Sequence, residues 1–339
     1  MPQGVLSLEA ADAYCRGLVR HYENFTVASR LSPRSLRRDL TRVYAFCRYT
    51  DDLGDESGDR AVAMRRLRRW RDETRESFEH DERTHPVLLA LTDTVHRHGL
   101  EEQPFIDLID ANIQDQRIDS YENWPALRQY CLLSAAPVGR IVLRLFDMSD
   151  EAAIPLSDDV CIGLQLANFA QDVSVDKKLG RTYLLQSDIG NRGIDLATRS
   201  MCERARALLE SGVALEAMAP PRLRVQLALY RLGGIAILDS IAAAGYRTAA
   251  RRPTVDRVRR VRLAATALVA TATSVKRYNT ERTRPGGGGG RSANLGASEE
   301  RENLFARRAS GQAEQIVRLP PRAAPQSPVT AQPAGDKRA

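Results

Sequence analysis

The chain has 339 residues, of which 27% are charged and 43% are hydrophobic, and its formal net charge at pH 7 is +7. This length allows one large domain or two ordinary ones. The composition excludes a fully disordered chain, a collagen-like chain and a disulfide-rich scaffold. It predicts a soluble, mostly globular protein with a sizeable core.

The excess of basic residues lies mainly near the C-terminal end. Residues 281–339 contain 10 Lys and Arg against 6 Asp and Glu, which leaves 40 against 37 for residues 1–280. The near-balanced body contains no RNP, homeodomain or zinc-finger spacing. We therefore expect no nucleic acid partner.

The cysteine pattern and the N-terminal residues favour a cytoplasmic location. The five cysteines are widely separated and form no CxxC pair, so they suggest neither a disulfide framework nor a zinc site. Charged residues interrupt the first twenty positions, where an export signal needs an apolar stretch. The longest uncharged, apolar run spans residues 263–275, whereas a membrane-spanning helix needs about 20 residues. We expect no spanning segment, and peripheral contact with the inner face of the membrane stays open.

Before residue 280 the sequence has a helical composition, because Ala, Leu, Arg and Glu dominate, Pro is sparse and alternating β-branched runs are few. No repeat of solenoid length is present, so the prediction is an all-α globular bundle. Helices are expected at 7–21, 33–52, 61–80, 86–98, 103–116, 124–146, 158–176, 201–218, 223–244 and 254–278.

A sharp compositional break follows this helical part. Residues 286–290 are five consecutive glycines, and the stretch after them is rich in Arg, Ala, Gln and Pro. Such a stretch lacks the apolar residues needed for a core. The sequence thus predicts a folded domain over residues 1–280 and a disordered tail over 281–339.

One expected helix, 223–244, contains two adjacent glycines, Gly233 and Gly234. Each glycine costs a helix about 1 kcal/mol relative to alanine. The pair therefore needs a reason, which is either the close approach of a neighbouring helix or the space that a cavity requires.

The strongest local signal is a polar stripe within an otherwise apolar helix. Gln165, Asn168, Asp172 and Asp176 follow one another at spacings of three or four residues and therefore share one helical face. Their neighbours are apolar, so this face is expected to be enclosed. Enclosed carboxylates need cations, and Mg²⁺ suits them because it binds one or two carboxylates together with phosphate oxygens.

A second acidic pair, Asp51 and Asp55, has the same i, i+4 spacing near the end of the helix expected at 33–52. By itself this cluster is also consistent with a solvated helix end, because Gly54 lies within it. Two such pairs in one helical chain favour a different arrangement. Facing each other across a cavity, they would hold two or three Mg²⁺ ions on a diphosphate.

Basic residues accompany both acidic pairs: Arg48 precedes Asp51, and Lys177, Lys178 and Arg181 follow Asp176. They form either simple ion pairs or a binding site for a diphosphate, to which Arg offers a bidentate fork. The sequence contains no GxSxG, GxGxxG or GxxxxGKS/T motif. Nucleophilic and hydride chemistry are therefore not indicated.

These motifs together resemble the squalene/phytoene synthase family in order and spacing, over roughly residues 10–280. The resemblance is carried by HYENF at 21–25, YAFCRYTDDLGDE at 44–56, YCLLSAAPVG at 130–139, QLANFAQDVSVD at 165–176 and GRTYL at 180–184. It implies an isoprenoid synthase fold, a helical bundle around a central apolar cavity. It also implies two aspartate-rich motifs that bind Mg²⁺ and a prenyl diphosphate.

Within the family, the combination is most similar to the hydroxysqualene synthase branch of bacterial hopanoid pathways. That branch converts presqualene diphosphate and water to hydroxysqualene and diphosphate, and it implies pathway partner enzymes for squalene formation. Many condensing relatives carry Arg directly before the second-motif aspartate, where this chain has Gln171. Two alternatives stay open: a head-to-head prenyl transferase making presqualene diphosphate, squalene or phytoene, and a non-catalytic assembly-factor relative.

The resemblance also implies residue roles. In the mechanism it implies, diphosphate departs with the help of the metal and leaves a cyclopropylcarbinyl cation, which aromatic faces stabilise until water captures the rearranged cation. No nicotinamide is required. The Mg²⁺ ligands would be Asp51, Asp55, Asn168, Asp172 and Asp176, the four aspartates and Tyr130 would be catalytic, and the substrate would contact His21, Phe25, Tyr44, Arg48, Gln165, Asn168 and Arg181.

Overall fold

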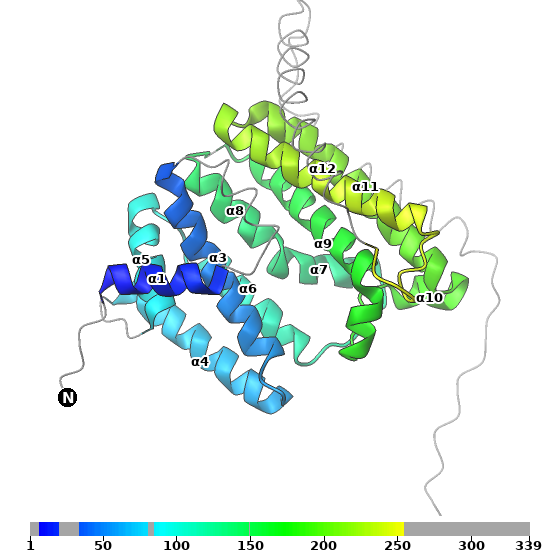
Figure 1. Cartoon of the computed structure of the whole chain (residues 1–339), viewed down its shortest axis with the longest axis horizontal. Helices are drawn as coiled ribbons and strands as arrows, with labels where there is room; N and C mark the ends of the chain where they lie inside the picture. The colour runs from blue at the N-terminus through cyan, green and yellow to red at the C-terminus, as the bar shows by residue number, and fades with distance from the viewer. Residues whose placement is uncertain (1–6, 20–33, 81–84, 149, 254–339) are drawn as a thin grey trace, which may run out of the picture. The chain divides into compact units, whose positions relative to one another are not determined.

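The computed structural model describes residues 7–19, 34–80, 85–148 and 150–253, and within these ranges it contains helices and no strand (Figure 1). The all-α prediction is confirmed. The helices are α1 (Leu8–Val19), α3 (Arg34–Asp55), α4 (Arg60–Glu79), α5 (Pro86–His98), α6 (Gln103–Asp115), α7 (Trp124–Ser134), α8 (Ala136–Leu145), α9 (Ala153–Lys178), α10 (Gln186–Arg192), α11 (Ile194–Met218) and α12 (Pro221–Ala243).

The helices form two packed groups, and helices from the middle of the sequence connect them. In Figure 1 the blue and cyan helices α1, α3, α4 and α5 contact one another, and the green and yellow helices α9, α11 and α12 form a second group. Helix α6 contacts α3 and α4, and α8 contacts α3, α6 and α9, so these two helices connect the groups. A single cluster of buried apolar side chains runs through both groups.

Local sequence explains where several helices begin and end. Asp59 caps α4 by accepting hydrogen bonds from the backbone N–H groups of Ala61 and Val62, and Asn123 caps α7 in the same way. The helix expected at 124–146 is instead two helices that meet at Ala135. Pro137 lacks a backbone N–H and clashes with a continuing helix, so it starts α8.

Some of the other helices begin at residues different from the expected ones. Helix α9 begins at Ala153, five residues before the expected start, and α11 begins at Ile194 rather than near residue 201. The short helix α10 was not expected, because its seven residues are fewer than the roughly 11 over which amphipathic periodicity can be recognised. The helix expected at 254–278 and the tail expected at 281–339 lie outside the described residues.

The two adjacent glycines of α12 have different surroundings. A Cβ atom at Gly234 would lie 2.8 Å from Leu209 Cδ1 and 2.9 Å from Leu164 Cδ2, so glycine allows α12 to pack closely on α9 and α11. A Cβ atom at Gly233 would meet nothing within 4 Å. Close packing therefore explains Gly234, whereas Gly233 faces open space.

Helix α12 is also long and apolar enough to cross a membrane by length and composition alone. No uninterrupted uncharged run marks this helix in the sequence, because α12 contains Arg231. In the structure that arginine forms a buried ion pair with Glu216 of α11, with 2.5 Å between Nε and Oε1. Such packing is typical of a core helix within a protein.

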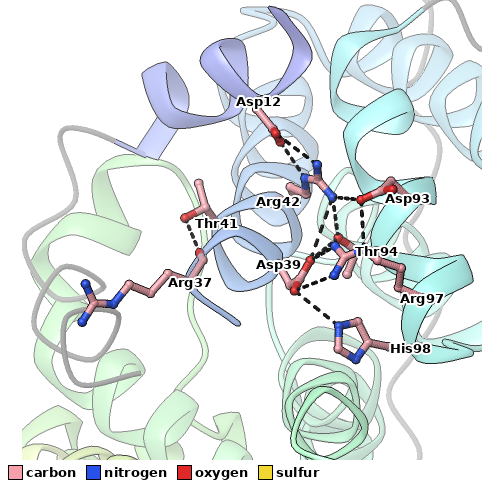
Figure 2. A network of polar contacts seen from close by, with 9 residues as sticks. All are labelled: Asp12, Arg37, Asp39, Thr41, Arg42, Asp93, Thr94, Arg97 and His98. Carbon is pink, nitrogen blue, oxygen red and sulfur yellow. Dashed lines mark hydrogen bonds and ion pairs between the residues drawn. The ribbon is translucent and has the colours of Figure 1, made fainter. Parts of the chain in front are cut away.

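A fully buried arginine joins helices α1, α3 and α5 (Figure 2). Arg42 of α3 donates from Nε to Asp12 Oδ1 of α1 at 2.6 Å and from Nη2 to Asp12 Oδ2 at 3.1 Å. Its Nη1 contacts Asp93 of α5 and donates to Thr94 Oγ1 at 3.2 Å. The guanidinium is thus matched by carboxylates from two neighbouring helices.

The same cluster continues around Asp39, which is also fully buried. Arg97 of α5 forms an ion pair with it, Thr94 Oγ1 donates to its Oδ1 at 2.8 Å, and His98 Nε2 lies 3.3 Å from its Oδ2 (Figure 2). Burial by itself would raise the pKa of Asp39, but the hydrogen bonds from Arg97 and Thr94 outweigh it and lower that pKa. This cluster fixes α3 against α1 and α5.

Candidate active site

The first acidic motif occupies the last turns of α3. Asn112 Nδ2 of α6 donates to Asp51 Oδ1 at 3.1 Å, and Arg48 lies 2.6 Å from Asp52 Oδ1 on the next face of the helix. Asp51 stays accessible to solvent, but the protein atoms around it exclude much of its hydration and raise its pKa to about 7. The Asn112 hydrogen bond opposes this rise, and the nearby charge of Asp55 adds to it.

The second acidic motif lies on α9, as expected. Asn168 is exposed, Gln165, Asp172 and Asp176 are half-buried, and all four share one helical face. Burial and the neighbouring Asp172 carboxylate raise the pKa of Asp176 to about 7. A carboxylate such as Asp176, which is difficult to ionise by itself, is well suited to accept a cation.

Arg181, just after α9, connects the two motifs. Its Nη1 donates to Asp55 Oδ1 of α3 at 3.0 Å, and its side chain is only 15% exposed. Burial would lower the pKa of Arg181, but the nearby Asp115 and Asp55 carboxylates outweigh it and raise that pKa. The acidic residues of α3 and the segment that follows α9 therefore line one polar site.

A buried carboxylate at the end of α6 belongs to the same region and was not predicted. Tyr130 Oη donates to Asp115 Oδ2 at 2.6 Å, and Tyr183 Oη donates to Asp115 Oδ1 at 3.1 Å. Burial raises the pKa of Asp115 to about 6, although both hydrogen bonds and Arg181 lower it. The sequence places Asp119 four residues after Asp115, but α6 ends at Asp115 and Asp119 pairs with Arg60 instead, so the spacing gave no guide to the site.

Aromatic rings surround these hydroxyl groups. The rings of Phe169 and Tyr183 are stacked, with centroids 3.9 Å apart and planes at 5°. Tyr130 lies 5.7 Å from Tyr183, and Tyr121 lies 5.3 Å from Tyr130. An aromatic cluster of this kind offers ring faces that attract a cation.

The segment that follows α12 covers part of the second motif. Arg252 forms an ion pair with Asp172, in which its Nη2 donates to Asp172 Oδ2 at 3.0 Å. Beside it, Gln171 Nε2 donates to the backbone oxygen of Pro253 at 2.7 Å. Neither contact was expected from the sequence.

The acidic residues fit a Mg²⁺ site that the substrate completes. Asp172 Oδ1 is buried, and its ion-pair partner is Arg252 Nε, so in the metal-free protein a guanidinium stands where the carboxylate would take a metal cation. Among those same residues, no group of three or more His, Cys, Asp or Glu side chains lies close enough to hold a metal. Mg²⁺ commonly takes one or two carboxylates and completes its shell with water and phosphate oxygens.

The remaining predicted site residues are less constrained. Tyr44 and Gln165 are half-buried and lie seven residues before Asp51 and Asp172, on the same helical faces as these aspartates. Arg48 already pairs with Asp52 and lies 3.5 Å from Glu56. His21 and Phe25 lie outside the described residues, so their expected contacts with substrate stay predictions.

A family model for squalene/phytoene synthase matches residues 18–259. The chain is 33% identical over 182 residues to a hydroxysqualene synthase of Zymomonas mobilis, a match that covers 53% of this chain and 60% of that protein. It is 31% identical over 162 residues to a presqualene diphosphate synthase of Rhodopseudomonas palustris, covering 48% and 57%. The chain thus spans less than two thirds of these curated relatives.

A solved structure gives a longer match. The chain superposes on the crystal structure of the squalene synthase HpnC from Alicyclobacillus acidocaldarius with a TM-score of 0.66 and 42% sequence identity. The match covers 71% of this chain and 97% of that one.

Proposed function

Because the chain belongs to the squalene/phytoene synthase family, whose members process prenyl diphosphates, we propose that it is a Mg²⁺-dependent hydroxysqualene synthase. Its reaction would convert presqualene diphosphate and water to hydroxysqualene and diphosphate. The similarity to the Zymomonas hydroxysqualene synthase and the 42% identity to the squalene synthase HpnC support this choice within the family.

In this proposal the diphosphate binds between the two acidic motifs. Asp51 and Asp55 on one side and Asn168, Asp172 and Asp176 on the other would hold Mg²⁺, which neutralises the charge of the leaving diphosphate. Arg181 lies between the motifs, and Arg48 lies beside the first. Their guanidinium groups donate hydrogen bonds to phosphate oxygens and hold the leaving group in place.

The aromatic cluster would receive the carbon skeleton. When the carbon–oxygen bond breaks, diphosphate takes the electron pair and the prenyl carbon is left with a positive charge. The stacked rings of Phe169 and Tyr183, with Tyr130 beside them, stabilise this charge through their π faces. Their apolar bulk also limits the access of water to the cation.

The observation that carries the hydration step is the buried Asp115, held by the hydroxyl groups of Tyr130 and Tyr183. Water that attacks the cation forms a carbon–oxygen bond and must lose one proton. A carboxylate with a pKa of about 6 is ionised at neutral pH and can accept that proton. Asp115 therefore acts as the proton acceptor, either directly or through a tyrosine hydroxyl.

Product analysis tests this proposal. The purified protein is incubated with Mg²⁺ and either presqualene diphosphate or farnesyl diphosphate, and the products are identified by mass spectrometry. We expect hydroxysqualene from the first substrate and no consumption of the second. Absence of turnover with both substrates would contradict the proposal and favour the non-catalytic alternative.

The Asp172→Ala variant tests the metal assignment. We expect it to lose activity while keeping the helical circular dichroism spectrum, because it removes a proposed Mg²⁺ ligand from a folded helix. Asp72→Ala, which removes an exposed carboxylate from α4, is the matched control and should keep activity. Normal turnover by Asp172→Ala would refute the metal assignment.

One observation favours a second candidate, the head-to-head prenyl transferase. Arg252 places a guanidinium on Asp172, next to Gln171, where many condensing relatives carry an arginine. The similarity to the presqualene diphosphate synthase of Rhodopseudomonas palustris is in line with this alternative. Consumption of farnesyl diphosphate in the same assay would establish it in place of the first proposal.

A further inference from the structure

The end of α12 turns sharply and brings Arg252 to the second acidic motif. Gly245 and Tyr246 both have left-handed backbone conformations, with φ values of 66° and 63°, and the Tyr246 N–H donates to Ile241 O at 3.0 Å. Two residues later, Thr248 is fully buried and anchors the returning chain. The segment that carries Arg252 is thus fixed on the protein at its start.

Gln171 fixes the other end of this segment. Its side chain is buried, and its amide donates to the Pro253 carbonyl at 2.7 Å, so it holds the backbone immediately after Arg252. The residue before Asp172 therefore supplies no charge of its own. Instead, it positions a guanidinium that comes from 80 residues further along the chain.

The ion pair between Arg252 and Asp172 is of a kind that a stronger cation can displace. The Arg252 side chain is 52% exposed and that of Asp172 is 23% exposed. Ion pairs with this much solvent access are weak, because water screens both charges. A divalent ion bound to Asp172 would repel the guanidinium, and the nearest strong anion available to Arg252 would then be the diphosphate.

We propose that Arg252 is the counter-ion of Asp172 in the metal-free protein and becomes a diphosphate ligand when metal and substrate bind, with Gln171 as its positioning residue. This inference rests on the proposed function. It explains how a chain with a neutral residue at position 171 still brings a positive charge to the second motif. It also gives the segment after α12 a part in substrate binding.

The proposal predicts opposite effects on metal and on diphosphate when Arg252 is replaced by glutamine. Mn²⁺ binding to the metal-free protein, measured by electron paramagnetic resonance without diphosphate, should become about two- to five-fold tighter, because a weak competing ion pair is lost. Binding of inorganic diphosphate at saturating Mg²⁺, measured by calorimetry, should become about tenfold weaker, because a charge-assisted hydrogen bond is lost. Damage to the fold would weaken both.

Arg251→Gln is the matched control, since it removes the exposed neighbouring arginine. We expect it to bind both ligands as the wild type does. In the Arg252→Gln background, Gln171→Arg should restore diphosphate affinity, because it returns a guanidinium to the second motif. Gln171→Ala alone should weaken diphosphate binding less than Arg252→Gln, because the guanidinium is then present but less well placed.

The outcomes separate this inference from the proposed function. If Arg252→Gln binds Mn²⁺ and diphosphate as Arg251→Gln does, the inference is wrong, whatever the enzyme activity. If Mn²⁺ binding is equal in the wild type and Arg252→Gln, including no binding in either, the counter-ion role is wrong. If the wild type binds no diphosphate at saturating Mg²⁺, the proposed function fails and this inference fails with it.

Discussion

Arg181 and Asp55 are 126 residues apart in sequence, yet Arg181 Nη1 donates to Asp55 Oδ1 at 3.0 Å and so joins the two acidic motifs. Replacing Arg181 by glutamine removes this connection and a cation from the proposed diphosphate site. Because one hydrogen bond to a charged group contributes about 1.5–3 kcal/mol, we expect kcat/KM to fall about 10- to 100-fold. The measurement is steady-state turnover of presqualene diphosphate at saturating Mg²⁺.

The control for this prediction is Arg60→Gln. Arg60 also forms an ion pair with an aspartate from another segment, Asp119, but both side chains are about half exposed. This exposed pair should contribute little, so kcat/KM should stay close to that of the wild type. Equal losses in the two variants would mean that Arg181 has no specific part in the site.

The pair of tyrosine hydroxyls on Asp115 predicts a shift in the pH dependence of the reaction. Asp115 must be ionised to accept a proton, so activity should rise with pH through about 6, its pKa. Tyr183→Phe removes a hydrogen bond that favours the charged carboxylate. The pKa of Asp115 should therefore increase, and the acid limb of the kcat/KM profile should move to higher pH.

Tyr121→Phe provides the comparison for this shift. The Tyr121 hydroxyl belongs to the same aromatic cluster but accepts its hydrogen bond from Gln114 Nε2, at 3.0 Å. Its removal should leave the acid limb in place. An unshifted profile for Tyr183→Phe would exclude Asp115 as the proton acceptor.

Helical periodicity predicted which acidic residues share a face of one helix, and it gave no sign of the contacts between helices. Asp51 with Asp55, and Asp172 with Asp176, repeat at i, i+4, so sequence alone placed each pair on one face. Asp119 lies at i+4 from Asp115, but α6 ends at Asp115, so these two share no helical face and periodicity does not single out Asp115. It is notable only because two tyrosines distant in sequence donate to it.

The contacts of Arg42 and Arg252 were invisible for the same reason. Their carboxylate partners Asp12 and Asp172 are 30 and 80 residues away, and no local pattern records which helix will pack beside which. The all-α fold class could be predicted from the residue composition and the helical spacing of apolar residues. The pairing of charges depends on the tertiary arrangement.

The raised pKa of Asp176 predicts that its negative charge, which metal binding needs, destabilises the metal-free protein. Its pKa is about 7 in the folded protein against an ordinary 3.8, so the folded state binds its proton more tightly than the unfolded state does. Its contribution to stability is therefore complete below about pH 4 and is lost as the pH rises through 7. Asp176→Asn cannot ionise, and in EDTA at pH 8 we expect it to raise Tm by about 2 °C or more.

Thermal unfolding followed by circular dichroism at pH 4 and at pH 8 checks this sign. At pH 4 the variant and the wild type should have similar Tm values, because Asp176 is then protonated. Asp72→Asn, an exposed position, should change Tm at neither pH. A lower Tm for Asp176→Asn at pH 8 would show that its charge is compensated in the metal-free fold.

The buried arginine of α3 makes a prediction about the unfolding free energy. Arg42→Met leaves the buried Asp12 without its cation, whereas Asp93 keeps Arg97, and breaking a buried ion pair in this way costs about 3–5 kcal/mol. Arg69→Met removes an exposed pair with Glu73 within α4 and should cost less than about 1 kcal/mol. Urea unfolding measures both, and equal values would mean that the network contributes no more than a surface ion pair.

The two glycines of α12 give opposite predictions for the same substitution. Gly233→Ala adds a Cβ atom that meets nothing within 4 Å, so it should gain up to about 1 kcal/mol from the higher helix propensity of alanine. Gly234→Ala places its Cβ atom within 3 Å of Leu209 and Leu164, and forcing these side chains apart costs about 1–3 kcal/mol. The net effect at Gly234 should therefore be a loss of up to about 2 kcal/mol.

Urea unfolding of the two variants separates the reasons for which the pair exists. If Gly233→Ala is stabilising, the position has room for a Cβ atom, and lower turnover of variants with larger residues there, at unchanged stability, would show that glycine leaves space for substrate. If both variants are equally destabilised, close packing accounts for both glycines, and the open space beside Gly233 has no part in substrate binding. Turnover of variants with larger residues at position 233 therefore decides whether α12 borders the proposed substrate cavity at this turn.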